Sequence, residues 1–172
     1  MTEAERFTFD LAGFLVRPAI ISPGQVADIR DQVLRIHADP HSLPPEHRHV
    51  PGGPSQLLID HPAVVGVVEE LIGPNVRIEN PNCVVRNQGE MHGGLHGGGP
   101  TQLDPIFGYR TQDGKIHAGM VRVIFELSDI HQGDGGTHFL AGVCNCSLLL
   151  PAPSDRPMLH LLLLSSSLPL RL

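Results

Sequence analysis

Aromatic and basic residues are scarce in this chain. Only 4% of its 172 residues are aromatic, tryptophan is absent, and 12 Lys and Arg against 18 Asp and Glu give a formal net charge of -6. Nucleic-acid-binding proteins usually carry a positive surface that meets the phosphates, so this balance argues against them. No apolar run approaches the roughly 18 residues that a membrane span needs. We therefore expect neither nucleic acid nor a membrane as a partner.

Cysteine is also rare, and its pattern bears on the compartment. Cys83, Cys144 and Cys146 make an odd number, without the spacing of a secreted disulfide framework. The segment 1–6 is polar and acidic and lacks the charged-then-apolar pattern of a signal peptide. Both features predict a cytoplasmic protein. Cys144 and Cys146 resemble half of a metal or redox site, but no second half accompanies them.

A glycine-rich segment, residues 88–100, contains His92 and His96 four positions apart. It has neither the G-x-G-x-x-G nor the G-x-x-x-x-G-K-[ST] spacing that cradles phosphates. A helical zinc site is excluded too, because the flanking glycines would destabilise a helix. Imidazole is the commonest protein ligand for metals, and glycine lets backbone approach an ion closely. The pattern indicates either a metal site with open coordination positions or a flexible loop with incidental histidines.

Two helices are indicated in the first half of the chain. Ser22 suits an N-cap, Pro23 the first helical position and Gln25 the reciprocal partner of a capping box, and an apolar stripe follows as far as Ala38. A second apolar run starts at Asp60-His61-Pro62 and is stopped by Gly73-Pro74.

Short strands are predicted around these helices. The loosely alternating stretch 7–16 holds one at Gly13–Val16, and further apolar runs lie at 76–78, 83–85, 121–127 and 138–140. Alternation within 121–127 would place Arg122 and Glu126 on one face and apolar side chains on the other. Two helices followed by a set of short strands predict an α+β fold with a β-sandwich or jelly-roll core.

The last part of the chain differs in character. Residues 147–172 are dominated by leucine, serine and proline, and their apolar clusters follow neither helical nor strand periodicity for long. We therefore expect a partial domain over residues 1–142 and a low-complexity tail over 143–172 outside the fold. One hypothesis for such a tail is a shifted reading frame or a misjoined coding segment.

Several segments, taken in chain order, carry a resemblance to a known family. They are Phe9–Val16 with the capped helix after it, His61–Pro74, Val84–Arg86 running into Leu95-His96, and Val121–Asp129 followed by Gly133–Gly142. In order and spacing they resemble the phytanoyl-CoA dioxygenase family of non-haem iron, 2-oxoglutarate-dependent oxygenases. The resemblance covers roughly residues 7–142. It implies N-terminal helices packed on a double-stranded β-helix, a jelly roll, which would be incomplete here.

This resemblance also implies a cofactor set and a reaction. The family holds Fe(II) with a His-x-Asp pair and a distal histidine, leaves positions for 2-oxoglutarate and oxygen, and oxidises a C–H bond of a small organic substrate. His96 matches the first histidine, but the carboxylate position two residues on is Gly98. His92 and Asp104 are weaker candidates for the vacant ligand position, and Glu90 would share a face with His96 on an extended strand.

Three readings of the departure at Gly98 stay open. In some halogenases of this class the same position is glycine or alanine, and a halide binds the vacant position on the metal. A degenerate, non-catalytic jelly-roll binding module fits the glycine equally well. A mis-predicted reading frame is the third reading. The region of the family's distal histidine and 2-oxoglutarate-binding basic residue is the leucine- and serine-rich tail. His160 and Arg156 are the candidates there by residue type, and their context does not match. The resemblance thus implies an impaired dioxygenase or a non-functional relative.

Overall fold

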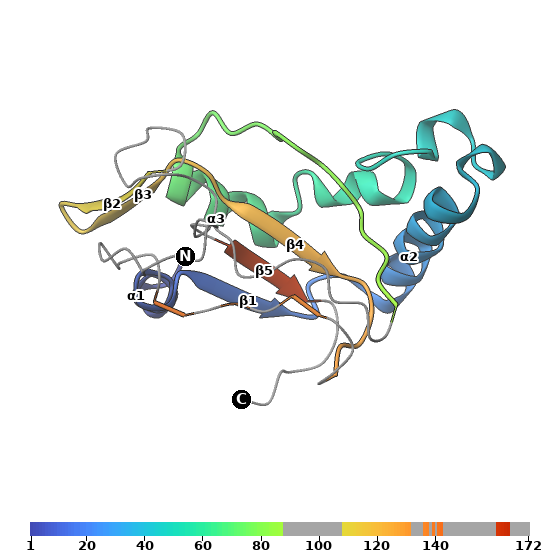
Figure 1. The fold of residues 1–172 in the computed structure, drawn as a ribbon. Coiled ribbons are helices and arrows are strands. Elements are labelled where there is room, and N and C mark those ends of the chain that lie inside the picture. Colours follow the sequence, from blue (N-terminus) through green and yellow to red (C-terminus); the bar gives the residue numbers. More distant parts are fainter. Residues whose placement is uncertain (88–107, 132–135, 138, 140, 143–160, 166–172) are drawn as a thin grey trace, which may run out of the picture.

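The computed structural model describes residues 1–87, 108–131, 136–137, 139, 141–142 and 161–165. These residues form a mixed helix and strand structure, as expected from the sequence (Figure 1). The helices are α1 (Glu3–Ala12), α2 (Pro23–Ala38) and α3 (Pro62–Ile72), with the 3-10 turns η1 (Pro40–Ser42), η2 (Pro45–His47) and η3 (Gly53–Leu58) between the last two. The strands are β1 (Phe14–Pro18), β2 (Tyr109–Gln112), β3 (Lys115–Ala118), β4 (Arg122–Glu126) and β5 (Leu161–Ser165).

The short strand expected at Gly13–Val16 is confirmed as β1, but the residues before it form a helix that the sequence analysis did not predict, α1. The reason is a complete capping box, in which the Thr2 hydroxyl accepts from the Glu5 N–H and the Glu5 side chain accepts from the Thr2 N–H. Gly13 then ends the helix in the left-handed conformation at φ 83°, which glycine adopts without strain.

Helices α2 and α3 confirm the sequence prediction. At the start of α2 the Ser22 Oγ accepts from the Gln25 N–H at 3.3 Å, and the Gln25 side-chain oxygen accepts from the Ser22 N–H at 3.1 Å. At α3 the His61 ring nitrogen Nδ1 accepts from the Ala63 N–H at 3.3 Å, so this histidine is a helix cap. Gly73 follows α3 with φ 128°.

The strands form two small sheets. In the first, β5 lies between β1 and β4 and is parallel to both. In the second, β2 and β3 form an antiparallel hairpin, which turns at Asp113 and Gly114, both with positive φ. The predicted strand at 121–127 is confirmed as β4. The stretches 76–78 and 83–85 were predicted to be strands, and this was wrong, because neither belongs to a ladder among the described residues.

Strand β5 comes from the leucine-rich tail. We expected residues 143–172 to lie outside the fold, yet five of them form the middle strand of the parallel sheet (Figure 1). Parallel strands that are covered on both faces often have continuous apolar runs, so the absence of alternation in this run of leucines did not argue against a strand. The rest of that segment lies outside the described residues, and the domain division at residue 142 stays a prediction.

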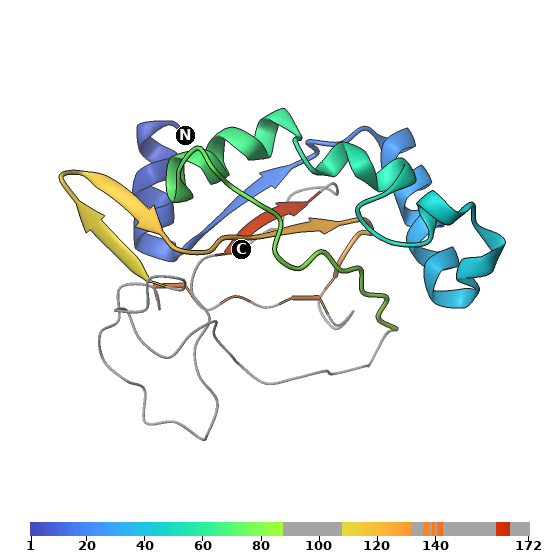
Figure 2. The same cartoon turned by 90° about the horizontal axis from the view of Figure 1, so that it is seen from above.

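Helices cover one face of the parallel sheet. Figure 2 shows α1 and α3 on the same side of β1, β5 and β4. The core between them is apolar, with Val123 and Phe125 of β4 packed against it as the alternation predicted. Its buried members are Phe9, Leu15, Val64, Val67, Leu71, Tyr109, Ile116 and Ala118. We call these elements, α1, α3, the hairpin and the parallel sheet, the sheet unit.

A second packed region consists of α2 and the loop 40–58, and we call it the α2 unit. Gln32 of α2 is only 2% exposed. Its Nε2 lies 2.9 to 3.4 Å from the carbonyl oxygens of His47, His49 and Gly52, and its Oε1 accepts from the Ser55 N–H at 3.0 Å. One buried side-chain amide therefore forms hydrogen bonds with several backbone C=O and N–H groups of a loop that has no long helix or strand of its own.

A jelly roll is not shown by the strands described here. Within the part of the chain that the structure describes, no helix is both long enough and apolar enough to cross a membrane.

Candidate functional site

The predicted metal ligands lie outside the described residues. His96, its weaker alternatives His92 and Asp104, and the glycine at 98 all belong to the segment 88–107. Their assignment therefore stays a prediction. The residues on either side of this segment are described, and they show what holds its two ends.

The entry to the glycine-rich segment lies beside the end of β4. Glu126, the last residue of β4, is partly buried, and burial raises the pKa of its carboxyl above the usual value. The positive charge of Arg86, in the extended chain before residue 88, lowers the pKa of Glu126 and so partly offsets the effect of burial. The charge of residue 86 therefore acts at the carboxyl end of the parallel sheet, where Glu126 lies.

The exit from the segment is fastened to α1. The Tyr109 hydroxyl donates to the Asp10 carboxylate, and the Thr111 hydroxyl donates to the same oxygen at 3.3 Å. Tyr109 is 7% exposed, so the ring is part of the core while its hydroxyl is bonded. The Gly119 N–H also donates to the Gly108 carbonyl at 2.8 Å. Sequence reasoning missed this cluster, because Asp10 and Tyr109 are far apart in the chain and no spacing rule links them.

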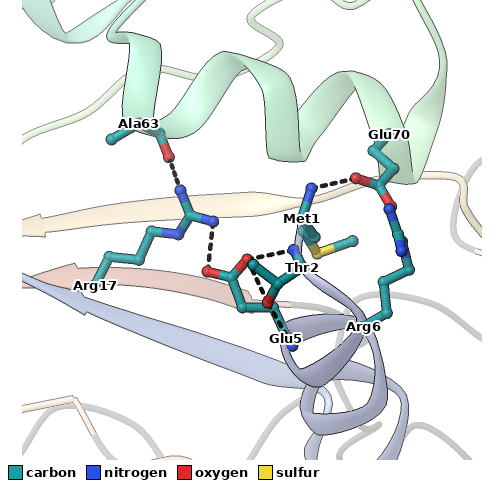
Figure 3. Close-up of polar contacts among 7 residues, drawn as sticks. All are labelled: Met1, Thr2, Glu5, Arg6, Arg17, Ala63 and Glu70. Carbon is teal, nitrogen blue, oxygen red and sulfur yellow. Dashed lines mark hydrogen bonds and ion pairs between the residues drawn. The ribbon is translucent and has the colours of Figure 1, made fainter.

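A charged network lies where α1, β1 and α3 meet (Figure 3). The Arg17 guanidinium donates to the Glu5 carboxylate and to the Ala63 carbonyl, both at 2.6 Å. A hydrogen bond from the Thr2 backbone N–H, together with Arg17, holds the pKa of Glu5 below its usual value. Because each charge here is held by another element of the fold, the network acts as a structural tie between them.

Glu70 of α3 forms the second half of this network (Figure 3). Its carboxylate accepts from the Met1 ammonium and from the Arg6 guanidinium. Partial burial alone would raise the pKa of Glu70, but the hydrogen bonds and charges of these two donors outweigh burial and lower it. Glu70 is therefore ionised at neutral pH and joins α3 to α1.

One thiol–imidazole contact joins α2 to the extended chain before the glycine-rich segment. The Cys83 Sγ lies 3.8 Å from Nε2 of His37, and that nitrogen lies 3.2 Å from the Cys83 carbonyl oxygen. Burial raises the pKa of the Cys83 thiol above its usual value. A thiol that is protonated at neutral pH is a weak nucleophile and a weak metal ligand.

The described residues do not supply an iron site. Within them, no group of three or more His, Cys, Asp and Glu side chains is arranged to hold a metal ion. The same part of the chain has a small pocket of about 160 Å³ after α3, lined by Ile72, Gly73, Pro74 and Asn75. That volume is below the roughly 300 Å³ at which small-molecule sites begin. A metal site of this chain would therefore have to include residues outside the described ones, and the predicted ligands His92, His96 and Asp104 are among these.

No family model, no curated protein and no solved structure matches this chain. The family named above is thus a resemblance carried by the quoted residues.

Proposed function

We propose that this chain is an iron(II)/2-oxoglutarate-dependent oxygenase-like protein that acts on a C–H bond of a small organic substrate and is impaired in its present form. The observation that carries the proposal is the order of the family-like segments around His96 in a glycine-rich run. Glycines beside a histidine leave space for an ion and its small co-ligands.

The arrangement of the described elements supports this proposal. The capped helix α2 and the helix α3 occur in the order that the resemblance implies, followed by strands. On one side of the segment 88–107 the charge of Arg86 acts on Glu126 of the sheet unit, and on the other side the Tyr109 hydroxyl donates to Asp10 of α1. In the proposed fold, an incomplete jelly roll, His96 would face the interior.

The residues that would hold iron are few. His96 provides one imidazole, and His92 or Asp104 takes the position that Gly98 leaves open. When bound, Fe(II) with 2-oxoglutarate supplies the oxygen chemistry, while the protein binds and orients the substrate. Metal affinity normally needs several ligands with supporting contacts, so we expect weak binding of the metal.

An anaerobic titration tests the proposal. Purified protein is titrated with Fe(II) or Mn(II), with and without 2-oxoglutarate, and metal uptake is followed by calorimetry and by the electron paramagnetic resonance of Mn(II). We expect one weak site that His96→Ala abolishes. The matched control is His117→Ala, because His117 is exposed on β3. No uptake by the unaltered chain, or equal uptake by His96→Ala, overturns the assignment.

A second candidate is a jelly-roll binding module without catalysis. The glycine at 98 favours it, since glycine has no side chain that could coordinate a metal. This candidate predicts a cooperative thermal transition without metal uptake. A flat melt with strong dye binding at all temperatures would instead support a chain that does not fold stably alone.

A further inference from the structure

The antiparallel hairpin of β2 and β3 has one buried side and one exposed side. On its inner side Tyr109, Ile116 and Ala118 are buried in the core of the sheet unit. Side chains at the alternate positions point the other way, and all of them are exposed. We call this exposed side, formed by Arg110, Gln112, Lys115 and His117, the hairpin face. Figures 1 and 2 show that the hairpin extends past the end of the parallel sheet.

The hairpin face is basic, although the chain as a whole is acidic. Arg110 and Lys115 provide two positive charges and His117 adds an imidazole, in a chain with a formal net charge of -6. Within the part of the chain that the structure describes, neither cation forms an ion pair with a carboxylate. Asp10 is bonded to the inner side of the hairpin, and Asp113 lies in its turn. The positive charge of this face is therefore available to a partner.

The basic groups have a spacing that suits an extended chain. Arg110 lies opposite His117, and Lys115 lies opposite Gln112, one step of two residues nearer the turn. Side chains directly opposite each other have Cβ atoms about 5 Å apart, and a step of two residues along a strand is about 7 Å. The same step separates side chains at alternate positions of an extended peptide. Two carboxylates at such positions would meet Lys115 and the Arg110–His117 pair together.

Contacts on the inner side hold the hairpin in place without a partner. The Tyr109 hydroxyl donates to Asp10 of α1, and the Gly119 N–H donates to the Gly108 carbonyl at 2.8 Å. A partner would lose its own conformational freedom on binding, but the backbone of the hairpin would not have to become ordered as well.

We propose that the hairpin face is a docking site for an extended acidic segment of a partner protein, with carboxylates at alternate positions. Charge complementarity is the argument for this partner. The Arg110 guanidinium can donate two parallel hydrogen bonds to one carboxylate, while the Lys115 ammonium attracts the next. The proposal goes beyond the proposed function and does not depend on it.

Two other polyanions fit the hairpin face less well. Single-stranded nucleic acid binds largely through aromatic side chains on which its bases stack, and the one Phe, Tyr or Trp side chain of the hairpin, Tyr109, is buried. An anionic membrane is typically bound by clusters of about four to eight basic residues. The hairpin face has two, Arg110 and Lys115.

A peptide titration of the full chain tests the docking site. The isotope-labelled protein is titrated at low salt with a short peptide in which glutamate alternates with threonine, and binding is followed by nuclear magnetic resonance. We expect shifts of the backbone amides of β2 and β3 and none in α2. The affinity should fall at least about tenfold between 0.01 M and 1 M salt, because salt screens exposed charges.

Two double variants separate the hairpin face from the charge of the whole chain. Arg110→Glu with Lys115→Glu should weaken peptide binding at least about tenfold, because two attractions become repulsions. Arg30→Glu with Arg77→Glu is the matched control, since it changes the net charge equally at exposed residues outside the hairpin. It should change the affinity by less than about threefold, because charges beyond a Debye length are largely screened. Equal losses for the two double variants overturn the proposal.

Changes to the peptide cover the case in which the hairpin variant does not fold. The same peptide with glutamine in place of glutamate should bind the unaltered chain at least about tenfold more weakly. A single-stranded oligonucleotide of equal charge, and vesicles that contain phosphatidylserine, should bind no better than the glutamine peptide. Absence of shifts in β2 and β3 with the glutamate peptide overturns the proposal. Binding of the oligonucleotide or the vesicles as tight as that of the glutamate peptide also overturns it, because the face would then attract any polyanion.

Discussion

The sheet unit and the α2 unit are stabilised in different ways. The sheet unit buries apolar side chains from two helices and from strands around Phe9 and Leu71, which are 0% and 1% exposed. The α2 unit is organised around the amide of Gln32, which bonds to four backbone groups of the loop 40–58. The α2 unit also buries Ile29, Val33 and Leu43, so the comparison teaches that a buried polar side chain can complement a small apolar core when its donors and acceptors are all paired.

The largest expected effect is on the sheet unit. Leu71→Ala should lower the free energy of unfolding by about 2–5 kcal/mol, because it removes a side chain that is almost fully enclosed and leaves a cavity. Urea denaturation followed by circular dichroism measures this. Leu34→Ala is the control, since Leu34 is 45% exposed on α2. Equal losses for the two variants would contradict the assignment of the core.

The second effect is on the α2 unit. Gln32→Ala should cost about 2 kcal/mol, because it removes a buried partner from the carbonyls of His47, His49 and Gly52 and from the Ser55 N–H. Hydrogen exchange should show faster exchange at the Ser55 N–H, which donates to Gln32, and little change in α3. Gln56→Ala is the matched control, because Gln56 is exposed on the same loop. Unaltered exchange at Ser55 would show that the amide does not organise the loop.

A smaller effect is expected at the start of α2. Ser22→Ala should destabilise the chain by about 1 kcal/mol, the usual cost of removing a helix cap. Ser22→Asp keeps an acceptor for the Gln25 N–H and should recover most of the loss. Thermal denaturation of the three proteins checks this, and an Asp variant as unstable as the Ala variant would count against the capping box.

The smallest effect is a pH dependence in the sheet unit. Burial raises the pKa of Glu126, so the folded state holds its proton more tightly than the unfolded state does. The stabilisation is complete below the usual pKa of 4.5 and is lost as pH rises through the raised value. As the pH rises from about 4 to 7, the free energy of unfolding of Glu126→Gln should therefore fall less than that of the unaltered chain. Melting temperatures across that range measure this, with the exposed Glu69→Gln as control; parallel curves for the unaltered and Glu126→Gln chains would refute it.

Local signals predicted much of the helical structure. The serine, proline and glutamine at 22, 23 and 25 specified the start of α2, and Gly73-Pro74 specified the end of α3. The helix α1 was missed, although Thr2 and Glu5 form the same kind of box, because the alternation at 7–16 was given more weight. Short-range hydrogen bonds decide where a helix begins, and they are visible in the sequence.

Contacts between distant residues were not predictable from one sequence. The bond from Tyr109 to Asp10 and the pairing of Gln32 with the loop arise from three-dimensional packing that no spacing rule encodes. The stretches 76–78 and 83–85 have strand-like composition, but strands need a partner edge, and composition does not supply one. The candidate site at His96 rests on residue types alone, so it is still a prediction.

The topology of the parallel sheet has a consequence for folding rate. Phe14 must find Leu161, a residue almost at the opposite end of the sequence, before the middle strand is in place. Such non-local pairing raises contact order and slows folding, since loop-closure entropy is lost before any ladder bond forms. Refolding should therefore proceed in two phases, a fast one for the helices and a slow one for sheet closure, and the yield should fall at high protein concentration while both strand edges await their partner.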